Sequence, residues 1–309
     1  MNSIEILKTG SYLPEYKVEN SYFNQKFQLE DNWIIKRTGI QTRYWKKEET
    51  ITQMAVKAVE NLFSKIDFNL QKIDCIIVAS TTNFQTMPGV SFEIQKEFDI
   101  KECICMDISA GCSGYINGLD YIRMLIALNQ IEYALVIGVE CLSSQVNEND
   151  VNTSILLGDG AGATLIGKSS TSKKYQSKLE SIGQDGDILT CSSQEKIKMD
   201  GKKIYKFGTV KVTENIKKLL EEIHIRISEV SYVIPHQSNQ RILENIATRL
   251  ELPKEKMYTN LKNIGNTFNA SIPIALDDMF EKKFIRTGDK VILVGYGGGL
   301  NIGSILLEI

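Results

Sequence analysis

The feature that most constrains the fold is that the second half of the chain repeats the pattern of the first. Each half contains a continuous apolar run that ends in glycine, and each half closes with a glycine cluster followed by another apolar run. The matching segments are 134–138 with 291–295, and 158–167 with 297–307. An internal repeat of this kind predicts a duplicated unit, with halves at residues 1–168 and 169–309.

Strand-like and helix-like segments alternate within each half, which predicts a layered α/β architecture. Ser271 is expected to cap a helix that has Pro273 in its first turn. The polar stretch 169–203 contains no long apolar run, so we expect it to link the halves over the surface and to wall a substrate channel. Helices are predicted within 55–63, 115–126, 216–223 and 242–250, and buried strands at 75–80, 134–139, 232–235 and 291–295.

Charge and cysteine content limit the class of protein. The net charge of −2 disfavours a nucleic-acid binder, because neutralising phosphates requires a clustered surplus of cations, although it leaves room for a local basic patch. None of the six cysteines forms a CxxC pair, and Cys103 and Cys105 are expected on a strand with their sulfurs pointing apart. Without a signal-peptide core or an apolar run near ~20 residues, the chain is expected in the reducing cytoplasm with no membrane span.

Three polar residues, each in its own turn of small residues, are the candidate catalytic groups. Cys112 lies between a strand-like and a helix-like segment, where the helix dipole is expected to lower its pKa and favour a thiolate. His236 ends a strand, the position at which open α/β sheets place ligands, and Asn266 lies between Gly265 and Thr267. A thiolate, a tunable base or donor, and a neutral amide together suit chemistry on a thioester.

Each of these residues also has a purely structural interpretation. Cys112 fits a buried cysteine in a tight turn, His236 a hydrogen-bonded loop histidine, and Asn266 an ordinary turn residue. The other histidine, His224, lies late in an amphipathic segment and is expected to be structural or to face solvent. The cluster 158–162 is no dinucleotide fingerprint, because a strand follows it rather than a helix, whereas 297–299 can present a backbone N–H to an oxyanion.

With these residues in view, the chain resembles the beta-ketoacyl-acyl-carrier-protein synthase III family of thiolase-fold condensing enzymes. The resemblance extends over essentially the whole chain and implies a five-layered αβαβα fold made of two duplicated halves. The N-terminal half, 1–168, would carry the nucleophile, and the C-terminal half, 169–309, would carry the histidine and the asparagine. The matching segments are 10–14, 33–40, 107–115, 158–163, 236–241, 265–267 and 296–299.

The resemblance also implies the chemistry. Cys112 would accept an acyl group from a thioester, with the backbone N–H groups of Cys112 and Gly298 as the oxyanion hole. His236 and Asn266 would then hold the carbonyl of malonyl-acyl-carrier protein while carbon dioxide leaves and a beta-ketoacyl product forms. Decarboxylation generates its own carbanion, so neutral donors suffice. Coenzyme A or phosphopantetheine thioesters would be substrates, and neither a metal nor a tightly bound cofactor is implied.

Carrier binding is implied at the surface around this site. Trp33 and Arg37 resemble residues that hold the adenine end of coenzyme A, since an indole face suits stacking on a base. Arg241, Lys206 and Arg249 resemble a basic rim that meets the acidic acyl carrier protein.

The acyl pocket contains both a family feature and departures from the family pattern. Met87 stands where the family places a bulky residue that reaches into the partner's acyl pocket, which implies a homodimer. Val151 replaces an arginine that clamps adenine, which weakens the case for an acyl-CoA starter and leaves carrier-bound donors open. Phe268 and Asn269 replace two small residues, so the acyl pocket is expected to be reshaped or shortened.

Several activities remain as alternatives at this point. Besides initiating fatty-acid synthesis, such an enzyme would suit a specialised acyl or polyketide pathway. The same acyl-cysteine would also support transfer to a non-malonyl acceptor without decarboxylation, and a catalytically silent subunit would only bind carriers. A thiolase is disfavoured because residues 294–300 contain no second cysteine, and a cysteine protease is disfavoured by the pattern over the whole chain.

Overall fold

Two β-sheets form the centre of the molecule in this computed structural model, which describes residues 3–85 and 87–309. The first sheet has the order β1-β7-β6-β4-β5 and the second β11-β12-β13-β8. The strands of the first are β1 (Ile4–Tyr12), β4 (Cys75–Ala79), β5 (Ile104–Ile108), β6 (Tyr133–Glu140) and β7 (Gly160–Lys168). Those of the second are β8 (Tyr175–Ser181), β11 (Tyr232–Pro235), β12 (Lys290–Gly297) and β13 (Asn301–Glu308).

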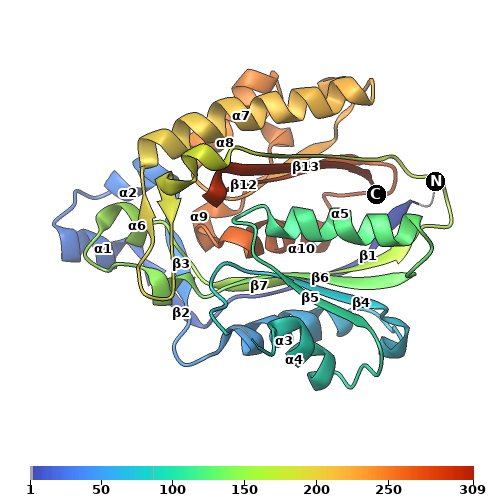
Figure 1. The fold of residues 1–309 in the computed structure, drawn as a ribbon. Coiled ribbons are helices and arrows are strands. Elements are labelled where there is room, and N and C mark those ends of the chain that lie inside the picture. Colours follow the sequence, from blue (N-terminus) through green and yellow to red (C-terminus); the bar gives the residue numbers. More distant parts are fainter. Residues whose placement is uncertain (1–2, 86) are drawn as a thin grey trace.

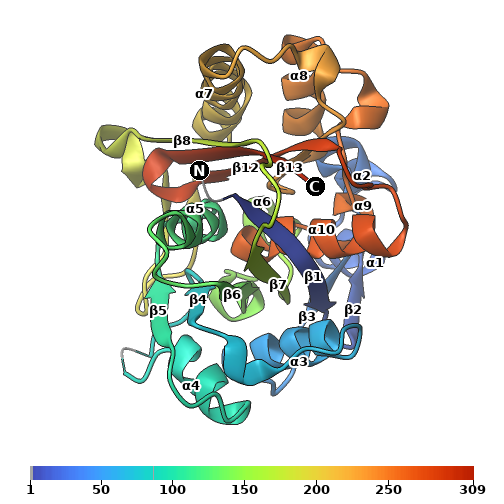
Figure 2. The same ribbon diagram turned by 90° about the vertical axis from the view of Figure 1, so that its right-hand side faces the viewer.

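Helices separate and cover the two sheets, giving five layers (Figures 1 and 2). Helices α3 (Ile51–Phe63) and α4 (Val90–Glu97) cover the outer face of the first sheet. Helices α5 (Gly114–Ala127) and α10 (Ser271–Glu281) lie between the sheets and contact both. Helices α7 (Gly201–Glu222) and α8 (Gln240–Leu250) cover the outer face of the second sheet. The predicted αβαβα fold is therefore confirmed.

The central strands show why continuous apolar runs in the sequence predicted this fold. Strands β4 and β6 are parallel neighbours, with Cys75 opposite Ala134, and β4 is buried along its whole length. Because helices cover both faces, such strands read as continuous apolar runs. Helix α3 begins before the apolar residues that predicted it, because its start is fixed by polar groups. The side chains of Thr50 and Gln53 each accept a hydrogen bond from the other's backbone N–H, which forms a capping box.

The remaining short elements gather at one end of the layers (Figure 1). Their apolar side chains form a separate buried cluster that includes Cys112 and Phe268. These elements are α1 (Asn20–Phe27), α2 (Trp33–Thr38), α6 (Val151–Ser154), α9 (Leu261–Ile264), and the two-stranded sheets β2 (Tyr16–Glu19) with β3 (Thr42–Trp45) and β9 (Leu189–Thr190) with β10 (Lys198–Met199).

Three expectations from the sequence are wrong in detail. The stretch 169–203 is more than a link, because it contains β8, an edge strand antiparallel to β13 whose polar residues hide it from an apolar search. Ser271 does not cap α10, whose N-cap is Ala270. Cys103 and Cys105 have their sulfurs 3.6 Å apart, because residues i and i+2 of an extended chain project to the same side.

Helix α7 ends at Glu222, so His224 lies just beyond it, exposed and with a φ of 51°. Within residues 3–85 and 87–309, no helix has both the length and the apolar character needed to cross a membrane.

The two halves approach each other closely at Gly138 of β6. A Cβ atom placed there would lie 2.1 Å from the carbonyl oxygen of Asn269, in the turn that leads into α10. Only glycine allows this approach, because the obstacle is backbone and cannot rotate away. The contact sets the position of the 265–271 turn against the first sheet.

Replacing Gly138 with alanine is expected to push this turn away from β6. Overpacking of this kind typically costs about 1–3 kcal/mol, so we predict a loss of that size in the free energy of unfolding, measured by chemical denaturation. Gly183→Ala is the matched control, since a Cβ there meets nothing within 4 Å. Equal stability of the two variants would contradict the close packing described here.

Candidate active site

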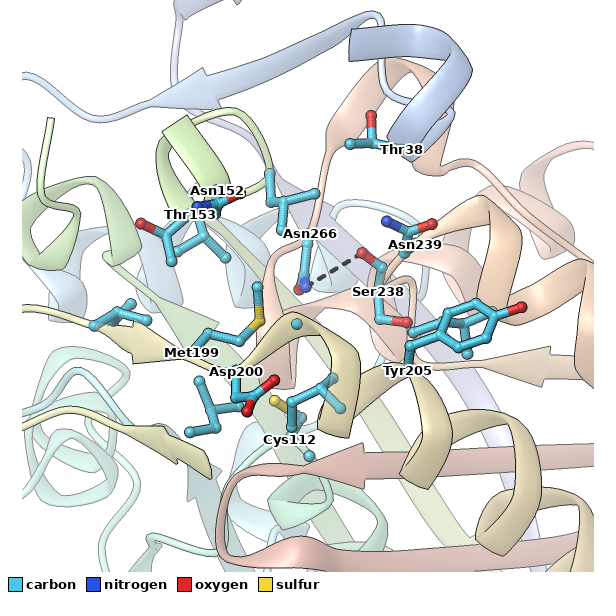
Figure 3. Close-up of a pocket in the computed structure, with 18 of the residues that line it drawn as sticks. Thr38, Cys112, Asn152, Thr153, Met199, Asp200, Tyr205, Ser238, Asn239 and Asn266 are labelled. Carbon is cyan, nitrogen blue, oxygen red and sulfur yellow. Dashed lines mark hydrogen bonds between the residues drawn. The ribbon is translucent and has the colours of Figure 1, made fainter. Parts of the chain in front are cut away.

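A cavity of about 690 Å³ contains all three candidate catalytic residues. Cys112 comes from the turn between β5 and α5, His236 follows β11, and Asn266 follows α9. Figure 3 shows Cys112 and Asn266 facing the same space. Cys112 thus lies in the same cavity as His236 and Asn266, which come more than 120 positions later in the chain, because the two halves meet here.

The surroundings of Cys112 are shaped by backbone. The side chain is only 2% exposed, and the backbone N–H of Gly298 donates a hydrogen bond to its sulfur. A Cβ at Gly297 would lie 2.7 Å from this sulfur, and one at Gly111 would lie 2.3 Å from the carbonyl oxygen of Gly298. Two glycines are therefore needed to bring an N–H donor onto the nucleophile.

The resting state of the Cys112 thiol differs from the expectation. Burial raises its pKa, the carboxylate of Glu140 raises it further, and the Gly298 hydrogen bond lowers it only in part. The thiol is therefore protonated in the free enzyme. A position before α5 does not give a thiolate here, because the cost of desolvating the anion exceeds the favourable interactions.

His236 is held rigidly as a neutral ring. It is 2% exposed, its backbone N–H donates to the carbonyl oxygen of Val294 at 2.7 Å, and its Nδ1 lies 2.8 Å from the hydroxyl of Ser271. The rings of Phe268 and Tyr296 pack edge-on against it. Burial lowers the pKa of His236 to about 3, so the ring carries no charge near neutral pH.

Asn266 has one end of its amide fixed by the main chain. Its Oδ1 accepts a hydrogen bond from the backbone N–H of Phe268 at 3.1 Å. Its Nδ2 makes a long contact of 3.5 Å with the carbonyl oxygen of Ser238, drawn as a dashed line in Figure 3. The Asn266 backbone pairs with Leu156 and Gly158, so the glycine cluster at 158–162 serves close packing and not nucleotide binding.

A buried carboxylate beneath the site was not identified from the sequence. Glu140, at the end of β6, is fully buried and accepts hydrogen bonds from Ser80, Thr81, Thr82 and Asn269. Burial raises its pKa, while these hydrogen bonds lower it. No local pattern reveals this network, because its members come from three separate segments.

The two residues that depart from the family pattern have different roles. Phe268 lines the cavity and adopts a φ of 44°, which places its ring beside His236. Asn269 points away from the cavity lining and bridges the halves. Its Nδ2 donates to Glu140 at 2.7 Å, and its Oδ1 accepts from the backbone N–H of Tyr115 in the first turn of α5.

The stretch 169–203 supplies one wall of the cavity, as expected. Leu189, Ile197 and Met199 all line it. Together with Leu156 and the other apolar side chains of this end of the molecule, they make the interior of the cavity largely apolar. An apolar acyl chain suits this environment.

The predicted carrier-binding residues are only partly gathered at the cavity. Arg37 and Arg241 line it, and the Arg37 guanidinium lies 5.0 Å from the centre of the Trp33 ring. Lys206 and Arg249 are exposed, but neither is among the residues that line the cavity in the part of the chain that the structure describes. The lysine that α7 contributes to the lining is Lys202. Arg249 is engaged within its own helix by Asn245.

Two further positions lie outside the cavity lining. Val151 is the first residue of α6, whose next residues Asn152 and Thr153 do line the cavity. Met87 is 84% exposed and does not line the cavity of its own chain. Among the residues that the structure describes, no group of three or more His, Cys, Asp or Glu side chains is placed to hold a metal.

The Glu140 carboxylate is expected to slow alkylation of Cys112, because it raises the pKa of the thiol and so reduces the fraction present as thiolate. Glu140→Gln removes the negative charge, so the Cys112 pKa should fall and alkylation by iodoacetamide at pH 7.5 should become roughly 3- to 10-fold faster. Both proteins would carry Cys191→Ser, because Cys191 is exposed. A Cys112→Ser variant identifies the labelled site, and an unchanged or slower rate in Glu140→Gln would contradict the electrostatic assignment.

Comparison with known proteins finds close relatives over the whole chain. Residues 106–186 match the family model of 3-oxoacyl-[acyl-carrier-protein] synthase III, and residues 220–309 match the model of its C-terminal part. The beta-ketoacyl-[acyl-carrier-protein] synthase III of Clostridium botulinum is 37% identical, with 99% of each chain aligned. That of Clostridium novyi is 35% identical, with 100% of this chain and 99% of the relative aligned.

Solved structures show the same relationship. The 3-oxoacyl-[acyl-carrier-protein] synthase III of Aquifex aeolicus superposes with a TM-score of 0.96 at 35% identity, covering 99% of this chain and 100% of that one. The enzyme of Thermus thermophilus gives 0.93 at 31% identity, covering 98% of both. The priming beta-ketosynthase of the R1128 polyketide pathway gives 0.94 at 26% identity, covering 99% and 96%.

Proposed function

The chain belongs to the 3-oxoacyl-[acyl-carrier-protein] synthase III family of condensing acyltransferases, and we propose that it joins an acyl group carried on Cys112 to malonyl-acyl-carrier protein. One observation carries this proposal: Cys112, His236 and Asn266 line a single cavity, with the N–H of Gly298 directed at the sulfur. A nucleophile, two neutral donors and a backbone donor in one apolar space suit thioester chemistry.

In the first half-reaction, the Cys112 sulfur attacks the carbonyl carbon of the incoming thioester. A new carbon–sulfur bond forms, the old one breaks, and the departing thiol leaves with the proton that Cys112 gave up. The backbone N–H groups of Cys112 and Gly298 hold the oxyanion. Because the Gly298 donor already contacts the sulfur, it needs little rearrangement as charge moves to the neighbouring oxygen.

In the second half-reaction, malonyl-acyl-carrier protein enters and loses its carboxylate as carbon dioxide. The electron pair of the broken carbon–carbon bond becomes an enolate, whose oxygen accepts hydrogen bonds from His236 and Asn266. The enolate carbon then attacks the acyl-Cys112 carbonyl, so that a carbon–carbon bond forms and the carbon–sulfur bond to Cys112 breaks. The released Cys112 thiolate takes up a proton from water. A neutral His236 is suited to this step, since no strong base is required.

The substrates follow from the cavity and its mouth. The apolar lining suits an apolar starter, and Phe268 restricts the space beside His236. We propose coenzyme A or phosphopantetheine thioesters as donors, with carrier-bound starters favoured by Val151, and no resident cofactor. The pathway is fatty-acid initiation or a specialised acyl or polyketide route; the similarity to a priming polyketide ketosynthase supports the second setting.

Carrier docking is assigned to the basic mouth of the cavity. Arg37, Arg241 and Lys202 line it and are exposed, and Trp33 supplies a flat face beside Arg37. Acyl carrier proteins are acidic, so complementary charge would guide the phosphopantetheine arm inward. Lys206 would extend this patch along α7, and Arg249 along α8.

We further propose that the protein forms a homodimer and works in the reducing cytoplasm. Strand β5 is an edge of the first sheet, and its residue Ile104 is an exposed apolar side chain. Phe84, Met87 and Phe92, in the connection between β4 and β5, are also exposed. An exposed apolar strand edge is a typical pairing surface, so a homodimer through β5 is expected, with Met87 available to the partner's acyl pocket. Six free cysteines fit the reducing cytoplasm.

Separating the two half-reactions tests the proposed roles. Intact-protein mass spectrometry after incubation with a panel of acyl-CoAs and acyl-carrier proteins should show one acyl increment on the wild type and none on Cys112→Ser. His236→Ala should still acquire the increment, because acylation relies on the oxyanion hole. Its condensation rate should fall about 100- to 1,000-fold, the usual cost of losing one donor to a developing anion.

Three results would argue against these roles. Equal loss of both half-reactions in His236→Ala would remove the division of labour between donor and oxyanion hole. Loss of the acyl group to another acceptor without carbon dioxide release would favour transfer without decarboxylation, and no increment with any donor would favour a carrier-binding subunit.

Charge reversal at the mouth tests carrier docking. Arg241→Glu is expected to raise the KM for malonyl-acyl-carrier protein about tenfold, equivalent to ~1.4 kcal/mol, with little change in kcat. The wild-type KM should rise with ionic strength and the variant's should rise less. Arg226→Glu is the control, because Arg226 is exposed beyond the far end of α7; an equal effect there would show a nonspecific charge effect.

A further inference from the structure

The carbonyl oxygen of Ala110 anchors the turn that carries the nucleophile. It accepts the backbone N–H of Ser113 at 3.3 Å and the Ser113 hydroxyl at 3.1 Å. The first of these bonds closes a four-residue turn, 110–113, in which Gly111 has a φ of 51° and Cys112 is the third residue. The direction of the Cys112 backbone N–H therefore depends on where the Ala110 carbonyl is held.

A third donor to this carbonyl comes from the other half of the chain. Nδ2 of Asn301 donates to the Ala110 oxygen at 2.6 Å, the shortest of the three contacts. A carbonyl oxygen can only accept, so the NH₂ end of the amide must face it. Of these three donors, Asn301 is the one that lies outside the turn, so its side chain ties the turn directly to β13.

Asn301 belongs to the same hairpin as the other donor of the proposed oxyanion hole. It is the first residue of β13 and pairs with Gly297, the last residue of β12, so residues 298–300 connect the two strands. Within that connection, the backbone N–H of Gly298 donates to the Cys112 sulfur. One short hairpin thus supplies one N–H of the hole directly and, through Asn301, holds the turn that supplies the other.

The nucleophile turn and the 298–300 connection are also in backbone contact. A Cβ at Gly111 would lie 2.3 Å from the carbonyl oxygen of Gly298. This contact limits how near the two loops come. The hydrogen bond from Asn301 is directional, so it fixes how one loop lies along the other.

The other end of the Asn301 amide argues against a purely structural role. Its Oδ1 is buried and lacks a hydrogen-bond partner among the residues that the structure describes. Leaving a buried acceptor unpaired is costly. A side chain that served stability alone is expected to satisfy both ends of its amide, so the value of Asn301 lies in its donor end.

We propose that Asn301 is a positioning residue for acyl transfer, which holds the Cys112 turn against the Gly298 loop and so sets the spacing of the two N–H groups that receive the oxyanion. The proposal rests on the proposed function for the identity of the hole, and it adds the side chain that fixes the geometry. A displaced donor binds a developing charge less well, even though both N–H groups remain.

Two reactions of Cys112 separate positioning from general damage to the turn. Acetylation by p-nitrophenyl acetate passes through a tetrahedral oxyanion: the carbon–sulfur bond forms, the carbon–oxygen bond breaks, p-nitrophenolate leaves, and the thiol proton goes to solvent. Alkylation by iodoacetamide occurs at a saturated carbon and expels iodide, so no oxyanion forms. A displaced hole therefore slows the first reaction and spares the second.

Asn301→Ala in a Cys191→Ser background is expected to lose about 10- to 100-fold in the rate of Cys112 acetylation and to stay within about twofold in alkylation. Both rates are measured at pH 7.5 by mass spectrometry of the Cys112 peptide. Ser181→Ala is the matched control with unchanged rates, because Ser181 is exposed and lies opposite Asn301 in the β8–β13 pair. An unchanged acetylation rate in Asn301→Ala, or an equal fall in both reactions, would overturn the proposal.

Asn301→Asp tests the donor separately from the shape of the side chain. The two side chains are nearly the same size, but a carboxylate has no proton to donate to Ala110 at pH 7.5. The new negative charge changes the thiolate fraction of Cys112, which affects acetylation and alkylation alike, so the ratio of the two rates is compared. We expect a ratio at least 10-fold below that of the parent protein. A ratio equal to that of the parent would overturn the proposal.

These outcomes are distinct from those that test the proposed function, because p-nitrophenyl acetate requires neither coenzyme A nor a carrier protein. Failure of the wild type to condense any donor would refute the function, while the rate ratios of the Asn301 variants would still decide the role of this side chain. If Asn301→Ala does not fold, as judged by thermal unfolding, the nearly isosteric Asn301→Asp carries the decision.

Discussion

The close contact between the 265–271 turn and the first sheet is the constraint on which the rest of the site depends. Gly138 lets the turn approach β6, and Asn269 then connects the buried Glu140 to the first turn of α5. Cys112 lies immediately before that helix, while His236 and Asn266 are held from the turn. The nucleophile and the two donors therefore come from different halves, and their spacing is set by one backbone contact.

Burial at this contact gives both reactive groups their neutral forms. Removal from water raises the pKa of Cys112 and lowers that of His236, so the pair does not form a thiolate–imidazolium couple at rest. A protonated thiol needs the approaching thioester and its oxyanion hole to become reactive. A neutral imidazole can stabilise an enolate by donating a hydrogen bond, without carrying a charge. The two half-reactions thus draw on different properties of one desolvated space.

Much of this could be predicted from the sequence, because the signals are local. Continuous apolar runs identified β4, β6 and β12, and small-residue turns identified Cys112, His236 and Asn266. The misses involve contacts between distant segments. Strand β8 is polar because it lies at an edge, Ser271 acts across to His236 instead of capping its helix, and Glu140 is satisfied by Ser80, Thr81, Thr82 and Asn269 from other elements. The prediction of a thiolate at Cys112 is wrong, because a position before a helix can be read from the sequence but the burial of the thiol cannot.

The central claim is that the acyl group on Cys112 is consumed by a decarboxylative condensation. A single-turnover experiment would mix purified acyl-enzyme with malonyl-acyl-carrier protein labelled in its free carboxylate, and count labelled carbon dioxide against acyl-Cys112 lost. The account predicts one carbon dioxide released for each acyl group consumed, with a beta-ketoacyl-carrier product of matching amount. Consumption of the acyl group without carbon dioxide, or carbon dioxide without acyl consumption, would contradict it.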